Sequence, residues 1–190
     1  MKKFFSIFFV FVFCILGVFS EESEKSKKDL GLEFGINLIN QYAIGDFSEY
    51  AKATLGCDFF VNYVLPKKLF KIENIGVNAA FGFANVFPNG NYVEKFTQNH
   101  FSFGAFYLIN LPKSFQLKPQ LNLGIINHKF SGGYSMKDSY SDFMICASFD
   151  VRYVFNFDLI LNVSPVYTFV PVKDGVINYL GVKLGASYRF

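Results

Sequence analysis

A histidine and a serine two positions apart, His100 and Ser102, are the pair whose residue types could support nucleophilic catalysis. A serine hydroxyl becomes a nucleophile when a neighbouring imidazole takes its proton and a third group orients that imidazole. The residues around them alternate between apolar and polar, which places both side chains on the more polar face of a strand. No glutamate follows Glu94. We therefore expect a hydrogen-bonding pair inside the fold, and no enzymatic activity.

Metal and cofactor sites are not expected either. His100 and His128 have no metal-ligand spacing with each other or with a cysteine. Cys57 and Cys146 fall on opposite faces of different strands in the alternating pattern, so a disulfide between them is not expected. The sequence predicts no metal ion and no cofactor.

Charged residues instead recur at alternate positions among glycines, serines and amides. From Ala51 to Tyr63, the seven residues of one alternating set are all uncharged, and the other set includes Lys52 and Asp58. The charged residues on such polar faces are Glu33, Lys52, Asp58, Lys118, Asp142, Asp150, Arg152, Lys183 and Arg189. Four acids face five bases, and charges removed from water must be paired or hydrated. These nine residues are the candidate site.

Eight segments with a period of two must position these charges. They cover 30–39, 51–63, 75–85, 100–109, 115–126, 142–153, 159–169 and 176–190. The longer connections, at 40–49, 86–97, 127–140 and 170–176, alternate with shorter turns. An even number of strands of about ten residues, joined in this way, is typical of membrane barrels. The sequence predicts an all-β fold, an eight-stranded antiparallel up-and-down transmembrane β-barrel.

The position of the aromatic residues favours an outward apolar face. A soluble lipocalin-like barrel would turn its apolar face inward around a ligand. Here, however, the polar face carries mid-strand charges and many glycines, which suit a narrow barrel interior. Aromatic residues gather where the strands meet the short turns, as a periplasmic girdle would require. The predicted girdle is Tyr63, Tyr107, Phe115, Tyr153, Phe157 and Tyr188, and Tyr50, Tyr140, Tyr167, Phe169 and Tyr179 could form an opposite ring.

Closure of such a barrel predicts the partners and width of its lumen. The last strand would lie beside the first, so we expect Glu33 to meet Lys183 or Arg189. An eight-stranded barrel is about wide enough for its own side chains. The lumen is therefore expected to be plugged, with at most a narrow, gated path.

The N-terminus has the pattern of a secretory signal. Lys2 and Lys3 precede an apolar run from Phe4 to Phe19, and a charged segment follows Ser20. We expect a cleavable signal peptide at 1–20, a charged periplasmic leader at 21–29 and a barrel at 30–190. Without Lys2 and Lys3 the chain has 16 basic and 15 acidic residues, so its charge suggests no nucleic-acid partner.

The ending Leu184-Gly-Ala-Ser-Tyr188-Arg-Phe190 resembles the C-terminal signature of bacterial outer-membrane barrels. The mature chain looks like the small eight-stranded family of OmpA, OmpW and opacity-type proteins. This resemblance implies an outer-membrane location, outer-membrane lipids as partners, and Tyr188 and Phe190 as a signal for the barrel-assembly machinery. The His100-x-Ser102 pair is similar to that of lipid A deacylases, but such a site must face lipid and needs a glutamate farther on.

Two functions remain open from the sequence. One is a monomeric barrel with a structural or narrow-channel role for small solutes. The alternative is a surface protein whose four outer loops bind an extracellular ligand, as in an adhesin.

Overall fold

The computed structural model describes residues 31–66, 73–89, 95–132, 136–173 and 175–190. The predicted signal peptide at 1–20 and the charged leader at 21–29 lie outside the described residues. Within the described ranges, no helix is both long and apolar enough to cross a bilayer.

The described residues form eight long strands, one very short strand and a single 3₁₀ turn. The long strands are β1 (Leu32–Ile44), β2 (Ala51–Val64), β3 (Ile75–Pro88), β4 (Lys95–Tyr107), β6 (Phe115–Gly132), β7 (Met136–Val154), β8 (Leu159–Val172) and β9 (Gly175–Arg189). The short strand is β5 (Ile109–Asn110), and the 3₁₀ turn η1 (Gly45–Glu49) joins β1 to β2. The predicted eight-stranded antiparallel architecture is confirmed, and β5 is a two-residue addition beside β6.

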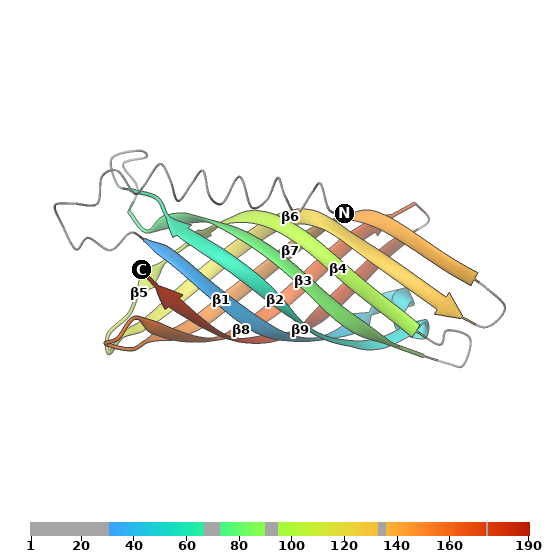
Figure 1. The fold of residues 1–190 in the computed structure, drawn as a ribbon, viewed down its shortest axis with the longest axis horizontal. Helices are drawn as coiled ribbons and strands as arrows, with labels where there is room; N and C mark the ends of the chain where they lie inside the picture. The colour runs from blue at the N-terminus through green and yellow to red at the C-terminus, as the bar shows by residue number, and fades with distance from the viewer. Residues whose placement is uncertain (1–30, 67–72, 90–94, 133–135, 174) are drawn as a thin grey trace. The chain divides into compact units, whose positions relative to one another are not determined.

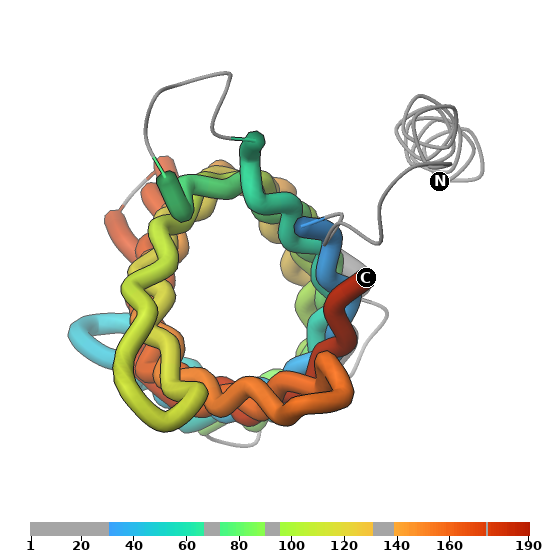
Figure 2. Tube along the Cα trace, turned by 90° about the vertical axis from the view of Figure 1, so that its left-hand side faces the viewer, coloured from blue at the N-terminus to red at the C-terminus, as the bar shows by residue number. Residues whose placement is uncertain are grey.

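The strands close into a barrel of residues Gly31–Phe190. Neighbours in the sequence pair in turn, β4 pairs with β6, and β9 pairs with β1 along twelve residues from Glu33↔Arg189 to Ile44↔Asn178. Figure 1 shows the tilted strands, and the view along them in Figure 2 shows the trace returning on itself as a ring. The β1–β9 and β4–β6 pairings close the sheet on itself, so its first and last strands are both paired along their length.

Alternation along each strand separates an inner from an outer face, as expected. On β1 the buried residues are Glu33, Asn37, Ile39, Gln41 and Ala43. The intervening residues point outward, and Leu38 keeps 62% of its surface exposed. Large apolar side chains are exposed in the same way on every long strand. A shell of exposed Leu, Ile, Val and Phe of this extent indicates a surface that is covered by something other than water.

Several strands extend well into the regions predicted as long loops. The ladder between β4 and β6 continues from the Phe101↔Ile125 pair to Asn99↔Asn127 and onward to Lys95↔Ser131. Between Phe101 and the start of β4, the residues in the outward register are Asn99, Thr97 and Lys95, which are polar. The apolar alternation therefore ends there, although the strand pairing continues. The loop bounds 40–49, 86–97, 127–140 and 170–176 were therefore wrong, because strands cover part of each region.

Two prolines lie where the ladders are interrupted. Pro119 lies between the last β4–β6 pair, at Gln120, and the first β5–β6 pair, at Leu117. Pro165 lies between two separate runs of β7–β8 pairs. Proline has no N–H to donate, so these interruptions let both residues remain inside strands.

Candidate functional site: a charged lumen closed at one end by aromatic rings

Six of the nine predicted charges form three ion pairs inside the barrel. Lys183 Nζ lies 2.8 Å from Asp58 Oδ2, and Lys118 Nζ lies 2.9 Å from Asp150 Oδ2. Arg152 pairs with Glu33. All six side chains are buried or nearly so. The mutual pairing compensates the desolvation that would otherwise make such charges unstable.

Each buried acid also accepts hydrogen bonds from neutral groups. Asn37 Nδ2 donates to Asp58 Oδ1 over 2.7 Å. Glu33 Oε1 accepts bonds from Asn62 Nδ2 at 3.0 Å and from Ser187 Oγ at 2.8 Å. The carboxylates are thus held by several strands at once, which fixes their positions in the lumen.

Amide side chains extend the hydrogen bonding from two of the ion pairs, through Asn62 from Glu33 and through Asn37 from Asp58. Asn78 Nδ2 donates to Asn62 Oδ1 at 2.6 Å, and Asn122 Nδ2 donates to Asn78 Oδ1 at 2.7 Å. Gln120 Nε2 also donates to Asn78 Oδ1, at 3.1 Å, and Asn162 Nδ2 donates to Asn37 Oδ1 at 3.1 Å. These amides were placed on the polar face by the sequence, but their mutual bonding could not be read from it.

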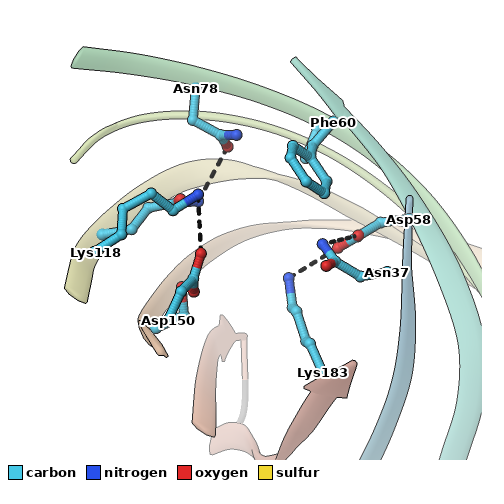
Figure 3. A pocket seen from close by; sticks show the side chains of 10 residues that line it. Asn37, Asp58, Phe60, Asn78, Lys118, Asp150 and Lys183 are labelled. Atoms are coloured by element: carbon cyan, nitrogen blue, oxygen red, sulfur yellow. Dashed lines mark hydrogen bonds and ion pairs between the residues drawn. The ribbon is translucent and has the colours of Figure 1, made fainter. Parts of the chain in front are cut away.

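The Lys118–Asp150 and Lys183–Asp58 pairs face each other across a small cavity (Figure 3). Its volume of about 20 Å³ is roughly enough for one water molecule. Lys118 also lies over two aromatic rings, 5.4 Å from the centroid of Phe60 and 5.2 Å from that of Phe106. The middle of the lumen is therefore filled by its own side chains.

The expected partner of Glu33 was wrong. Arg189 stands opposite Glu33 in the β1–β9 register, but its guanidinium donates to Gln116 Oε1 at 3.2 Å. Lys183 stands opposite Ile39, farther along the barrel, and reaches Asp58 on β2. In so narrow a lumen a long side chain reaches past its neighbouring strand, so adjacency does not determine the pairing.

Two other predicted charges do not join this network as expected. Lys52 is exposed, because it is the extra residue of a bulge: Ala51 pairs with Pro88 and Ala53 with Phe87. A bulge reverses the direction of side chains on one side of it, so the prediction that Lys52 faces the lumen was wrong. Asp142 is half-buried near the loop end, where its Oδ2 lies 3.9 Å from His128 Nδ1.

The histidine and serine that could have served catalysis lie on the lumen side. Ser102 is buried, and its Oγ accepts a long hydrogen bond of 3.4 Å from Asn122 Nδ2. A Cβ built on Gly82 would meet the His100 ring, so the imidazole lies over that glycine. Within the described residues, no group of three or more histidine, cysteine or acidic side chains is arranged to hold a metal ion.

Where the strands meet the longer connections, the lumen is lined by aromatic and aliphatic residues. We call four aromatic residues there, Phe47, Phe96, Phe130 and Tyr179, the aromatic plug. Phe96 and Phe130 stack with centroids 4.1 Å apart, and Phe47 lies edge-on to Phe96 and Tyr179. Tyr179 is fully buried, so it does not belong to an outer aromatic ring. Its position on the inner face follows from the alternation, but Phe47, Phe96 and Phe130 lay in predicted loops.

The predicted girdle residues lie at the opposite, short-turn end. Tyr107, Phe115, Tyr153, Phe157 and Tyr188 are exposed on the outside, and Tyr63 is half-buried. Phe115 stands opposite Tyr153, with ring centroids 5.1 Å apart, and Tyr188 and Phe190 are 4.9 Å apart. Cys57 and Cys146 are both free, as expected.

Neither a family model nor a curated protein matches the sequence. Solved structures do match the fold. Neisserial surface protein A is similar over 86% of this chain and all of its own, with 10% identity and a TM-score of 0.65. Ail, the attachment invasion locus protein of Yersinia pestis, is similar over 84% and 99%, with 18% identity and a TM-score of 0.58.

The outer membrane protein OprG from Pseudomonas aeruginosa covers 85% of this chain and 97% of its own, with 10% identity and a TM-score of 0.56. At these identities the likeness concerns architecture. It agrees with the closed antiparallel barrel. The chain therefore has the fold of the small eight-stranded outer-membrane β-barrels.

Proposed function

We propose that the protein is an integral barrel of the bacterial outer membrane with a structural or narrow-channel role for small solutes. The outward apolar face supports the membrane location, because strand-exposed Leu and Phe of this extent require a lipid cover. The fold it shares with outer-membrane barrels supports the same location. In this proposal Tyr188 and Phe190, at the end of the last strand, serve the assembly machinery.

The observation that carries the functional proposal is the filled lumen. Three buried ion pairs and the amides between them occupy its middle. Opening a wide pore would separate these buried opposite charges, which is costly in a low-dielectric interior. The barrel is therefore a closed cylinder at rest, and any solute it passes is small enough to move between these side chains.

The alternative is ligand binding by the outer loops, and these loops are shorter than the sequence predicted. The β6–β7 pairing continues to Gly132↔Met136, well inside the region predicted as the loop 127–140. Ligand binding there would use strand ends more than loops. The filled lumen is the feature that gives the narrow-channel proposal its specific support.

Planar-bilayer recording tests the proposal. Refolded protein, checked for folding by its heat-dependent gel mobility, should give at most a small conductance. Replacing Asp58 and Lys183 together by alanine removes one ion pair and should raise that conductance, whereas Lys52→Ala, outside the lumen, should not. A large, steady conductance from the unaltered protein would contradict a lumen filled by its own side chains.

A further inference from the structure

The loop end of the lumen is closed by a different kind of contact from the middle. The aromatic plug lies on a cluster of small and aliphatic residues, which includes Ala43, Ala51 and Val86. Phe96 and Tyr179 are almost completely buried there. Stacked and edge-on ring contacts make up most of the closure at this end, where the Tyr179 hydroxyl also lies 3.4 Å from His128 Nε2, so the closure is mainly apolar.

Within the plug, Phe47 joins two opposite walls of the barrel. Its ring centroid lies 6.3 Å from that of Phe96 on β4 and 5.8 Å from that of Tyr179 on β9. β4 and β9 are four strands apart in either direction around the barrel. A side chain that contacts both therefore reaches across the lumen.

Phe47 is also the member of the plug that a strand does not hold. Phe96, Phe130 and Tyr179 belong to β4, β6 and β9, whose ladders fix their backbones. Phe47 belongs to η1, a five-residue turn whose N-cap, Ile44, has an apolar side chain. The residues of η1 are exposed or half-buried. Moving Phe47 out of the lumen would require a shift of η1 and no separation of strands.

We propose that Phe47 is a movable stopper that controls access to the lumen from the loop end. The inference rests on the proposed function, because a stopper matters only to a barrel whose lumen admits a solute. The Phe47 side chain, which belongs to the turn η1, forms a second, apolar barrier. The first barrier is the set of ion pairs in the middle of the lumen. With Phe47 in place, water-soluble molecules are excluded from the residues just beyond the plug.

A native cysteine lies where this exclusion can be measured. Cys146 is buried on the inner face of β7, in a cluster with Ile126, Met144, Val166 and Val170. Ile177 packs against both this cluster and the residues around the plug, so the two are neighbours. The Cys146 thiol therefore reports whether a reagent has passed Phe47.

The experiment measures how fast a charged, membrane-impermeant maleimide modifies Cys146 in the refolded full chain. Cys14 and Cys57 are replaced by serine, so that Cys146 is the single thiol. The parent should react slowly, and Phe47→Ala should react about tenfold faster or more, because local opening limits the rate. The matched control is Phe87→Ala, since Phe87 is an outward-facing aromatic residue at the same end. It should react like the parent.

Phe47→Leu is a second variant for the same measurement. Leucine keeps part of the apolar side-chain volume, so the labelling rate of Cys146 should fall between those of the parent and Phe47→Ala. This variant also answers the question if Phe47→Ala fails to fold. Equal rates for the parent and the folded Phe47 variants, or fast modification of the parent, would overturn the stopper. A low conductance, together with a Cys146 labelling rate that is the same in the parent and the Phe47 variants, would reject the stopper but not the filled lumen. A high conductance, together with a labelling rate that depends on Phe47, would reject the filled lumen but not the stopper.

Discussion

Asp58 shows how the barrel compensates a buried charge. Its carboxylate is fully buried and contacts Lys183 on β9 and Asn37 on β1. The three residues come from three consecutive strands of the closed sheet, so the pair joins the strands on either side of the β1–β9 closure. Removing one charge would leave the other buried without compensation.

We predict that Asp58→Asn lowers the free energy of unfolding by about 3–5 kcal/mol, because the Lys183 ammonium would lose its counter-charge. Urea unfolding in lipid vesicles, followed by heat-dependent gel mobility, measures the change. Lys183→Met in the same chain should recover part of the loss, since the uncompensated charge is then gone.

Asp46→Asn is the control, because Asp46 is an exposed acid in η1 and its replacement should change stability by less than about 0.5 kcal/mol. Equal effects at Asp46 and Asp58 would show that the buried pair is not maintained in the membrane-embedded protein.

The sequence predicts the face of most of these residues but not their partners. A period of two is enough to place Glu33, Asp58 and Lys183 on the inner face. The partner depends on side-chain length, lumen width and strand stagger, so Glu33 meets Arg152 three strands away. Lys52 shows the limit of the period itself, because a single bulge moves its side chain to the other face.

At the scale of the strands, β6 and β7 form the longest hairpin of the described barrel. Their pairing runs from Phe115↔Tyr153 to Gly132↔Met136. The β7–β8 pairs, in contrast, begin at Ile145↔Phe169. The outer part of β7 therefore has a ladder on the β6 side, and the described pairs place none on its other side. The apolar–polar alternation does not reveal this extension, because the outward residues there, such as Asn127 and Ser141, are polar.

We predict that about half of the backbone amides of Ser139–Met144 exchange rapidly with solvent deuterium, because alternate residues of a strand point their N–H groups to opposite neighbours. Residues 124–129 of β6 stand opposite these residues and pair with both β4 and β7, so they should be protected. Hydrogen–deuterium exchange resolved to short peptides compares the two segments. Equal protection would mean that another strand covers the outer edge of β7.

For the whole molecule, the outward apolar face has opposite consequences in lipid and in water. Phe103 keeps half of its surface exposed in the middle of β4, and Tyr107 on the same face ends that strand in the predicted girdle. In a bilayer the first would lie in hydrocarbon and the second near the headgroups. If this outward face were in contact with water instead, an arginine at either position would cost little.

We therefore predict that Phe103→Arg lowers stability in lipid vesicles by about 2–4 kcal/mol, whereas Tyr107→Arg costs about 0–1 kcal/mol, because the penalty for a charge falls with distance from the bilayer midplane. Urea titrations of the two variants and the parent, in the same vesicles, give both values. The two residues share a strand, a face and an aromatic side chain, so the difference isolates depth. A Phe103→Arg variant as stable as the parent would place this face in water and remove the basis for a membrane location.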